Sequence, residues 1–408
     1  MKILLLLPQL PYPPHKGGTI RAWHFLRWLA QKHEVSLLAF ADCADVPEEV
    51  ECLCARVRTI APPLRKTHDR LRDLVASPLP DLALRLRSPE YERALGRWLG
   101  EERFDVVQVE SLEVSLAWLR VSGGLPVERR PWAVLDELNA EYLLQWRAFR
   151  NDLVAPRRWA LAGYSLVQTA KLRAYESRVC REFKRVVVVC DEDATALRAL
   201  RSSLVPALVP NGVDSDYFGF APDSGQRPPQ IVFTGTMDFR PNVDAVVWFA
   251  ESILPLVRRG VPDARFVIVG ANPSTAVQRL ADVPGVEVTG RVSDVRPYLA
   301  ASAVYALPMR IGGGVRLKVL EAMSFGLPVV STTLGCSGTV LEPERHYLGA
   351  NDSAEFARRL SEVLTGRRDC RSMVAEARRL MENRYDWRRI CPSLEGAYPA
   401  VVAAGVVG

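Results

Sequence analysis

The sequence lacks a long uncharged apolar run. None of its apolar stretches reaches the roughly 18–20 residues that a membrane-spanning helix needs. The N-terminal run, residues 2–8, is also too short for a secretory signal, and several prolines follow it without a small-residue cleavage site. We interpret this run as a buried first strand and expect a cytoplasmic protein.

Cysteine and histidine are sparse and scattered. The eight cysteines include no C-x-x-C pair, and the five histidines include no H-x-x-x-H or H-E-x-x-H spacing. Zinc and redox sites are typically built on such spacings. The sequence therefore predicts buried thiols, no bound metal and no cofactor.

Lysine is scarce, because 46 of the 53 basic residues are arginine. We attribute most of this bias to codon usage, but it makes each lysine unusual. Lys318 is the one lysine that follows Lys184 in the sequence.

The net charge of +6 is too small to indicate nucleic-acid binding, and residues 56–97 carry most of it, with ten basic and five acidic side chains. Within this stretch, residues 64–75 have the pattern of a basic amphipathic helix. One interpretation is an ordinary solvated helix face. The other is attraction to anionic lipid headgroups or to a lipid-phosphate substrate, with the protein peripheral on the inner face of the cytoplasmic membrane.

Strand-like apolar runs alternate with helical stretches, which indicates α/β architecture with parallel sheets. Residues 218–230 are rich in Gly and Pro, as linkers often are, and separate two such sets. Helices are expected at residues 19–32, 172–183, 243–259 and 315–325, among others. Because open parallel sheets bind ligands beyond the carboxyl ends of their strands, the loops that follow strands are the candidate site.

The chemically richest of these loops is residues 308–323. Three consecutive glycines follow a predicted strand and precede a helix, and backbone N–H groups in such a place commonly bind phosphate. Arg316 and Lys318 lie beside the helix start, where cations oppose the helix dipole unless an anion is bound. We therefore predict that both contact an anionic ligand. Glu321 one turn later forms either a helical ion pair or a contact with two ribose hydroxyls.

The run of residues 312–332 resembles the nucleotide-sugar site of glycosyltransferase family 4 (group 1 type). Residues 209–214, 233–235, 290–299 and 386–387 resemble other segments of that family, so the resemblance spans nearly the whole chain. It implies the GT-B fold, in which two Rossmann-like α/β domains with parallel sheets face a central cleft and a C-terminal helix crosses back to the N-terminal domain.

The resemblance also implies domain boundaries and a reaction. Residues 1–215 would bind the acceptor, residues 216–385 would bind the nucleotide sugar, and residues 386–408 would pack back on the first domain. The enzyme would be a hexosyltransferase that moves a sugar from a nucleotide diphosphate donor to a glycan or lipid-linked acceptor, in bacterial polysaccharide or glycolipid biosynthesis.

Site residues carry over from the resemblance position by position. The expected donor contacts are Gly17, Gly18, Gly235, Val292, Gly312, Gly313, Gly314 and Glu321. Arg316 and Lys318 would hold the diphosphate and neutralise the leaving group without a metal ion. Asn139 and Glu141 would contact the acceptor or the transferred sugar, with helix capping as the alternative. The pair Gly17 and Gly18 is equally typical of a plain β–α turn.

Two positions depart from the family pattern. Relatives often carry His where Leu138 stands, and many carry Glu near the position of Gly313. We favour a retaining glycosyltransferase in which the acceptor attacks on the same face as the departing diphosphate. The sequence offers no convincing carboxylate nucleophile, so a double displacement is disfavoured. The departures keep open a non-catalytic subunit that binds nucleotide sugar or lipid. A sugar-nucleotide epimerase is the third alternative, and it would need histidine and carboxylates for acid–base chemistry in the cleft.

Overall fold

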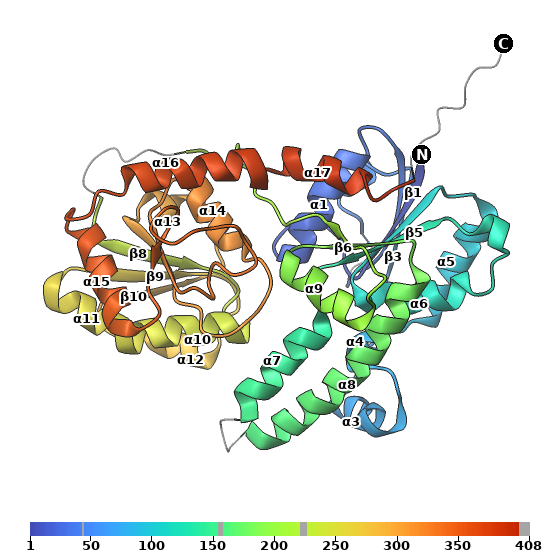
Figure 1. Ribbon diagram of the computed structural model, residues 1–408, viewed down its shortest axis with the longest axis horizontal. Coiled ribbons are helices and arrows are strands. Elements are labelled where there is room, and N and C mark those ends of the chain that lie inside the picture. The colour runs from blue at the N-terminus through green and yellow to red at the C-terminus, as the bar shows by residue number, and fades with distance from the viewer. Residues whose placement is uncertain (43–44, 154–157, 221–226, 400–408) are drawn as a thin grey trace, which may run out of the picture. The chain divides into compact units, whose positions relative to one another are not determined.

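The computed structural model describes residues 1–42, 45–153, 158–220 and 227–399. Contacts within the chain divide it into two compact units, one formed by Met1–Pro210 with Cys391–Gly408 and the other by Asn211–Ile390. Each unit contains one parallel sheet with helices on both faces (Figure 1). The predicted α/β class with parallel sheets is therefore confirmed. The predicted linker, residues 218–230, lies partly outside the described residues.

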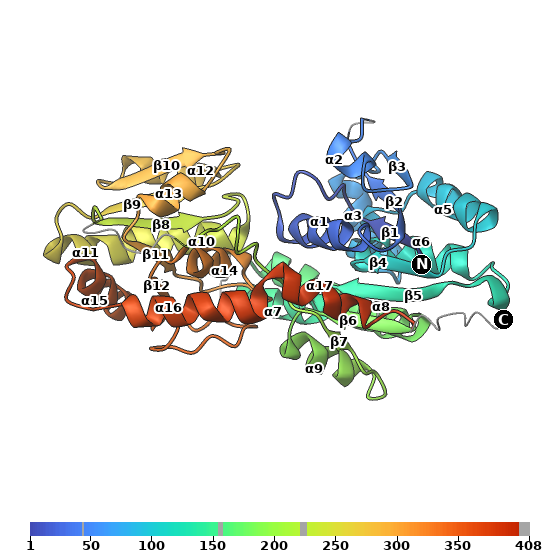
Figure 2. The same cartoon turned by 90° about the horizontal axis from the view of Figure 1, so that it is seen from above.

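The first unit has a seven-stranded sheet in the order β3-β2-β1-β4-β5-β6-β7, which can be followed from top to bottom in Figure 2. Its strands are β1 (Lys2–Leu7), β2 (Glu34–Phe40), β3 (Arg56–Ile60), β4 (Val106–Glu110), β5 (Trp132–Glu137), β6 (Arg185–Val188) and β7 (Ala207–Leu208). Its helices are α1 (Gly17–Leu29), α2 (Glu48–Glu51), α3 (Thr67–Ala76), α4 (Asp81–Arg85), α5 (Pro89–Glu101), α6 (Leu112–Ser122), α7 (Glu141–Leu153), α8 (Trp159–Glu182) and α9 (Asp191–Leu200), with a 3-10 turn at Val127–Arg129.

The second unit has a six-stranded sheet in the order β10-β9-β8-β11-β12-β13. Its strands are β8 (Gln230–Thr234), β9 (Arg265–Val269), β10 (Val286–Gly290), β11 (Val304–Leu307), β12 (Val329–Ser331) and β13 (Leu348–Gly349). Its helices are α10 (Arg240–Trp248), α11 (Leu254–Gly260), α12 (Thr275–Gln278), α13 (Arg296–Ala300), α14 (Leu317–Phe325), α15 (Ser353–Leu364), α16 (Arg371–Leu380) and the start of α17 (Trp387–Glu395), with π-helical turns at Phe249–Ile253 and Met381–Tyr385 and a 3-10 turn at Arg279–Asp282.

Each sheet reverses its strand order beside its first strand. In the first unit, β1 pairs with both β2 and β4, and in the second unit, β8 pairs with both β9 and β11. The connections from the two sides diverge at such a point and leave a crevice outside the carboxyl ends of the strands. β1 is buried almost throughout because helices cover both faces of its sheet. The topology thus predicts one crevice in each unit.

The C-terminal helix crosses from the second unit back to the first. Glu395 near its end pairs with Lys32 at 3.2 Å and with His33 at 3.1 Å, and the indole N–H of Trp132 donates to the carbonyl of Ala397 at 3.1 Å. The crossing helix implied by the resemblance is therefore confirmed. Residues 400–408 of the predicted terminal segment lie outside the described residues.

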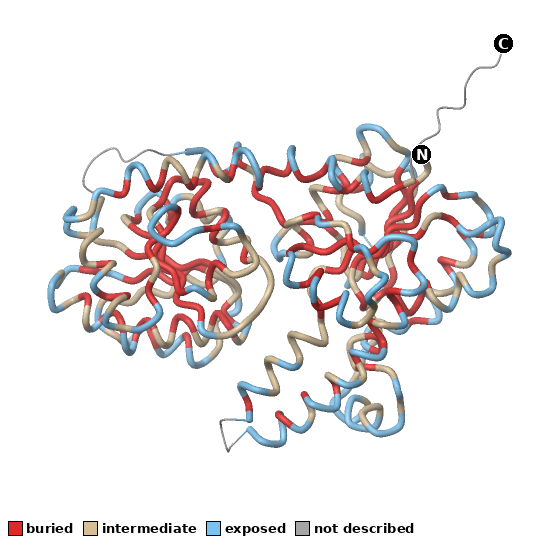
Figure 3. The backbone as a smooth tube through the Cα atoms, in the orientation of Figure 1, coloured by how far each residue is buried: buried red, intermediate tan, exposed pale blue. Residues whose placement is uncertain are grey.

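Two helices extend beyond the first sheet as a pair. α7 and α8 run alongside each other, with α3 next to α8, at the end of the first unit (Figure 1). Figure 3 shows that the sheets are buried, whereas α7 is mostly of intermediate burial and α8 alternates between buried and exposed residues. A helix was predicted at residues 172–183, but α8 already begins at Trp159. No helix in the described part of the chain is long and apolar enough to cross a membrane.

Candidate functional site

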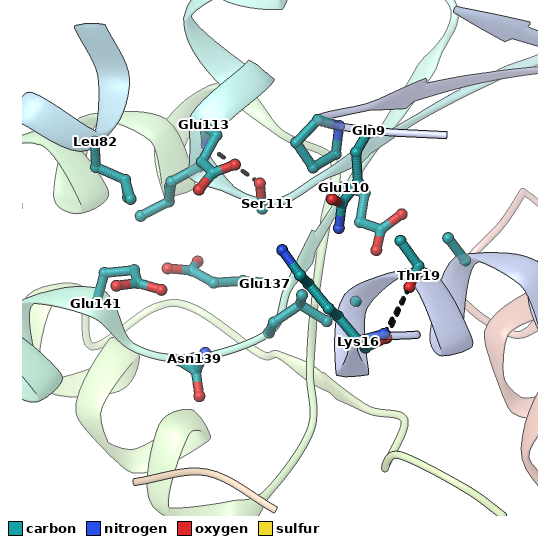
Figure 4. A pocket seen from close by; sticks show the side chains of 15 residues that line it. Gln9, Lys16, Thr19, Leu82, Glu110, Ser111, Glu113, Glu137, Asn139 and Glu141 are labelled. Atoms are coloured by element: carbon teal, nitrogen blue, oxygen red, sulfur yellow. Dashed lines mark hydrogen bonds between the residues drawn. The ribbon is translucent and has the colours of Figure 1, made fainter. Parts of the chain in front are cut away.

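The crevice of the first unit holds a cavity of about 250 Å³ (Figure 4). Pro8 and Gln9, which follow β1, contribute to it. So do the ends of β4 and β5 and the first turn of α1. The other lining residues are Lys16, Gly18, Thr19, Ala22, Leu82, Glu110, Ser111, Leu112, Glu113, Glu137, Leu138, Asn139 and Glu141. In Figure 4, Lys16 extends into the cavity from the start of α1.

Four carboxyl groups line this cavity, and burial raises the pKa of each. Desolvation raises the pKa of Glu141 to about 7 and that of Glu113 above its ordinary value. It raises the pKa of Glu110 well above its ordinary value, and the nearby Asp136 carboxylate adds to this shift. The pKa of Glu137 is also raised well above its usual range, first by desolvation and then by Glu176. Burial thus favours the protonated forms of Glu110 and Glu137, and Glu141 is near its midpoint at neutral pH.

The N-terminus of α7 is capped by side chains from other helices. Glu176 on α8 accepts from the backbone N–H groups of Glu141 and Tyr142 at 2.6 and 3.1 Å, and Asp193 on α9 accepts from that of Ala140 at 2.9 Å. These bonds satisfy the free backbone N–H groups at the helix start, so capping by Asn139 or Glu141 is not needed. The side chains of Asn139 and Glu141 line the cavity instead.

The two N-terminal glycines occupy different environments. Gly18 lines the cavity, and a Cβ there would lie 3.4 Å from Leu138 Cδ1 and 3.7 Å from Glu110 Oε1. Gly17 is the first residue of α1 and is exposed, outside the cavity lining. Leu138 therefore gives the cavity an apolar wall.

A fully buried ion pair lies behind this cavity. The Arg21 guanidinium on α1 donates to both carboxylate oxygens of Asp136 on β5 at 2.8 Å, and neither side chain is exposed. Arg21 also donates to the carbonyl of Pro210 at 3.0 Å. The pair ties α1 to the centre of the sheet and so fixes the helix start that carries Lys16 and Gly18.

In the second unit, Lys318 lies beside the loop that follows β8. Lys318 Nζ donates to Asn242 Oδ1 at 2.7 Å and lies 4.2 Å from the ring centroid of Phe233. The Asn242 amide N–H₂ donates to the carbonyl of Thr236 at 2.9 Å, which fixes the amide orientation and turns its oxygen toward the lysine. Lys318 is the second residue of α14, and the first turn of this helix contains no acidic residue.

Arg316 is held by the glycine loop that precedes it. Its Nη1 donates to the carbonyl of Gly314 at 2.7 Å and to Ser337 Oγ at 3.0 Å, and the side chain is buried. Gly312 and Gly314 have φ values of +119° and +70°, a region that favours glycine. The predicted helix began at residue 315, but α14 begins at Leu317, so Arg316 occupies the N-cap position. The backbone of Arg316 is extended, so the helix does not begin before Leu317.

Burial brings the pKa values of Lys318 and Glu321 together. Desolvation lowers the pKa of Lys318 to about 7, and the Glu321 carboxylate opposes this shift. Desolvation raises the pKa of Glu321 to about 7, and the lysine opposes this shift. A bound anion would favour the charged form of Lys318. Both groups are thus poised to change charge near neutral pH.

The remaining predicted positions lie in the loops of the same sheet. Gly235 directly follows β8, Gly313 lies within the glycine loop, and Val292 follows β10 and packs partly against the core. The Arg296 guanidinium lies 4.0 Å from the Tyr217 ring centroid and pairs with Asp294 at 2.7 Å.

The predicted site residues did not include Asn242, Ser337, Glu110 or Glu137. Glu110 and Glu137 end apolar parallel strands, so an acidic residue at a strand end was an available signal. Asn242 and Ser337 carry no local signal, because folding alone brings them to residues far along the chain. Within the described residues, no group of three or more His, Cys, Asp or Glu is arranged to hold a metal ion.

Comparison with known families matches both units. The family "Glycosyltransferase Family 4" matches residues 15–217, and the family "Glycosyl transferases group 1" matches residues 228–366. The chain belongs to glycosyltransferase family 4.

The similar proteins agree with this assignment. A phosphatidyl-myo-inositol mannosyltransferase of Mycobacterium leprae is 26% identical over 383 residues, which cover 88% of this chain and 95% of that protein. One of Propionibacterium freudenreichii is 30% identical over 207 residues, which cover 48% and 51% of the two chains. The matched stretch thus spans about half of this second relative. Sucrose-phosphate synthase of Thermosynechococcus elongatus has a TM-score of 0.72 at 14% identity, with 97% and 98% of the chains covered, and this likeness shows the GT-B fold.

The Gly235→Ala substitution in this family 4 chain is expected to displace Lys318. A Cβ at Gly235 would lie 2.5 Å from Lys318 Nζ and 2.7 Å from Asn242 Nδ2, at a φ of +149°. We expect a stability loss of about 1–3 kcal/mol from backbone strain and a weaker affinity for nucleoside diphosphates, measured by calorimetry. Gly366→Ala is the matched control, because its φ is +70° and its Cβ meets open space. Equal nucleotide affinity in both variants would contradict the proposed position of the ligand.

Proposed function

We propose that this protein is a retaining, metal-independent glycosyltransferase that moves a hexose from a nucleotide diphosphate donor to a lipid-linked glycan acceptor. The observation that carries the proposal is the pair of cations, Arg316 and Lys318, which the glycine loop and Asn242 hold at the start of α14 in the crevice of a family 4 chain. Cations in this place lack a helix-end carboxylate and fit an anionic ligand.

The donor would bind through its diphosphate and its ribose. Arg316 and Lys318 would contact the diphosphate and stabilise the negative charge that develops as it leaves. Glu321 would accept hydrogen bonds from ribose hydroxyls one helical turn away. The backbone near Val292 would contact the base, and the glycines at 235 and 312–314 would let the donor approach closely.

The transfer would retain the configuration of the sugar. The acceptor hydroxyl attacks the anomeric carbon on the face from which the diphosphate departs, through an oxocarbenium-like state. The new carbon–oxygen bond forms as the bond to the phosphate oxygen breaks, and the hydroxyl proton passes to that phosphate oxygen. The positive helix end and the two cations support this departure.

The cavity of the first unit would bind the acceptor. Its carboxyl groups can hydrogen-bond sugar hydroxyls, and Glu141 and Asn139 lie on its wall. Gly17 and Gly18 would leave room for the donor at the start of α1. The names of similar proteins specify mannosyl transfer to phosphatidyl-myo-inositol, which supports a lipid-linked acceptor.

A non-catalytic subunit that binds a nucleotide sugar is the second candidate function. The observations that favour it are the apolar Leu138 wall of the cavity and the absence of a carboxylate at Gly313. The lining of the described cavity contains no histidine, which leaves the epimerase without its expected acid–base group.

Binding and turnover across a panel of nucleotide sugars test the proposal. We expect one donor and its nucleoside diphosphate to bind, and Glu321→Ala to weaken that binding roughly ten- to hundredfold, since it loses hydrogen bonds to a charged group. Glu251→Ala, an exposed glutamate of the same unit, is the control. If Glu321→Ala binds each donor as the wild type does, the assigned site is wrong. If the wild type binds a donor but never turns over with lipid-linked acceptors, the non-catalytic function replaces the enzyme.

A further inference from the structure

The first half of α8 turns its apolar side chains outward. The exposed side chains are Trp159, Leu161, Leu166 and Val167, with exposed fractions of 61, 55, 46 and 40%. At about 3.6 residues per turn, Trp159, Leu166 and Val167 share the outer face of the helix, whereas Leu161 lies on another side. The buried ones at this end are Ala162, Ser165 and Gln168. A surface helix of a globular protein normally has the opposite arrangement.

Polar contacts hold α8 in this orientation. Ser165 Oγ accepts from the side-chain amide of Gln145 on α7 at 2.9 Å, and Gln168 Oε1 accepts from the backbone N–H of Asp81 on α4 at 3.0 Å. Rotating the helix to bury Leu166 and Val167 would break both bonds. The outward apolar face is therefore a feature of the fold.

Neighbouring elements add further exposed apolar side chains at the same end of the unit. Lys171 on α8 donates to the carbonyls of Asp73, Leu74 and Ser77 at 3.0, 2.7 and 2.6 Å, which fixes the end of α3 beside α8 (Figure 1). These side chains are Leu71 and Val75 on α3 and Trp146 and Leu153 on α7. Exposed apolar side chains gathered in this way usually mark an interaction site.

The charges around this face select its partner. Residues 158–175 contain no acidic residue, and Arg173 on α8 and Arg150 on α7 are exposed. Arg158 at the start of the apolar stretch is also exposed, but it pairs with Asp152 at 3.4 Å. A second copy of the chain would bring these like charges together. An anionic surface complements them, and tryptophan beside arginine is typical of helices that lie in the headgroup region of a bilayer.

The basic helix predicted from the sequence contributes less charge than expected. Arg65 pairs with Asp73 at 2.6 Å and with Asp81 at 2.8 Å, and Arg70 pairs with Asp81 at 2.9 Å. Acidic residues of the same segment thus neutralise the charge of these cations. The apolar face of α8, with α7 beside it, is the stronger candidate for membrane contact.

We propose that the α7–α8 pair docks on an anionic lipid bilayer, with the outer face of α8 inserted at headgroup depth. Burial of Trp159, Leu166 and Val167 in the bilayer supplies the attraction, and Arg150 and Arg173 contact lipid phosphates. This docking is independent of sugar transfer, so its failure and that of the proposed function are distinguishable.

Vesicle flotation tests the proposal with the full chain. We expect the wild type to float with vesicles of phosphatidylcholine and phosphatidylglycerol, and Leu166→Gln/Val167→Gln to lower the bound fraction at least tenfold. Arg150→Gln/Arg173→Gln should lose binding to the anionic vesicles by severalfold. Val205→Gln, an exposed apolar residue of the same unit outside this face, should float like the wild type. Thermal unfolding of each variant should match that of the wild type.

Three outcomes would overturn the docking. One is wild-type protein that stays at the bottom of the gradient with anionic vesicles. Another is a Leu166→Gln/Val167→Gln variant that floats as the wild type does. The third is a wild-type dimer in size-exclusion chromatography that this double variant converts to monomer, without vesicle binding by either, which would assign the face to a second copy of the chain.

Discussion

Lys318→Ala is expected to lower the turnover of sugar transfer roughly 10²–10³-fold, the usual loss when one preorganised charge-stabilising donor is removed. The lysine lies at the start of α14 with its ammonium group on Asn242, where the leaving diphosphate is proposed to bind. The fold should persist, because burial of the ammonium group costs free energy and its removal leaves the packing of the apolar core unchanged. Steady-state rates and circular dichroism together separate these effects, and near-wild-type turnover would contradict the assigned role.

The pH dependence of nucleotide binding gives an independent measure of the same lysine. Its pKa of about 7 in the free protein should rise when an anion binds. Lys318 therefore loses its proton in the free protein above about pH 7, and affinity should fall by up to tenfold per pH unit between about pH 7.5 and 9.5. The phosphates themselves are fully ionised in this window. Lys318→Arg keeps its charge and should remove the slope, whereas an unchanged slope would place the titration elsewhere.

Arg21→Met is expected to destabilise the first unit by about 3–5 kcal/mol, because it leaves Asp136 as a buried unpaired carboxylate. Both side chains are fully buried, so water cannot replace the lost partner. Hydrogen exchange of the β5 backbone amides at increasing urea concentration reports this unit separately from the second one.

The double variant Arg21→Met/Asp136→Leu controls for the loss of packing. It removes both charges together, and we expect it to recover most of the stability lost in the single variant, since a buried pair often contributes little net free energy. If the single variant stays within about 1 kcal/mol of the wild type, the ion pair does not hold α1 to the sheet.

The sequence predicted the parts of the molecule that have local signals. The three glycines with Arg316 and Lys318 predicted an anion-binding loop, and apolar runs predicted most strands. β3 was not predicted, because it is a partly exposed edge strand with arginines at positions 56 and 58. The start of α8 was not predicted, because its leucines face outward and leave no inward apolar stripe. Asn242 meets Lys318 only through the fold of the sheet, so no local pattern reveals it.

The return of the chain end to the first unit determines when that unit can finish folding during synthesis. Glu395 binds Lys32 and His33, and the Tyr398 hydroxyl donates to the Gln108 side chain. The ribosome must therefore complete the second unit before these contacts can form, although N-terminal domains usually fold first. A nascent chain halted at residue 210 would hold the whole first sheet and still lack its last helical support.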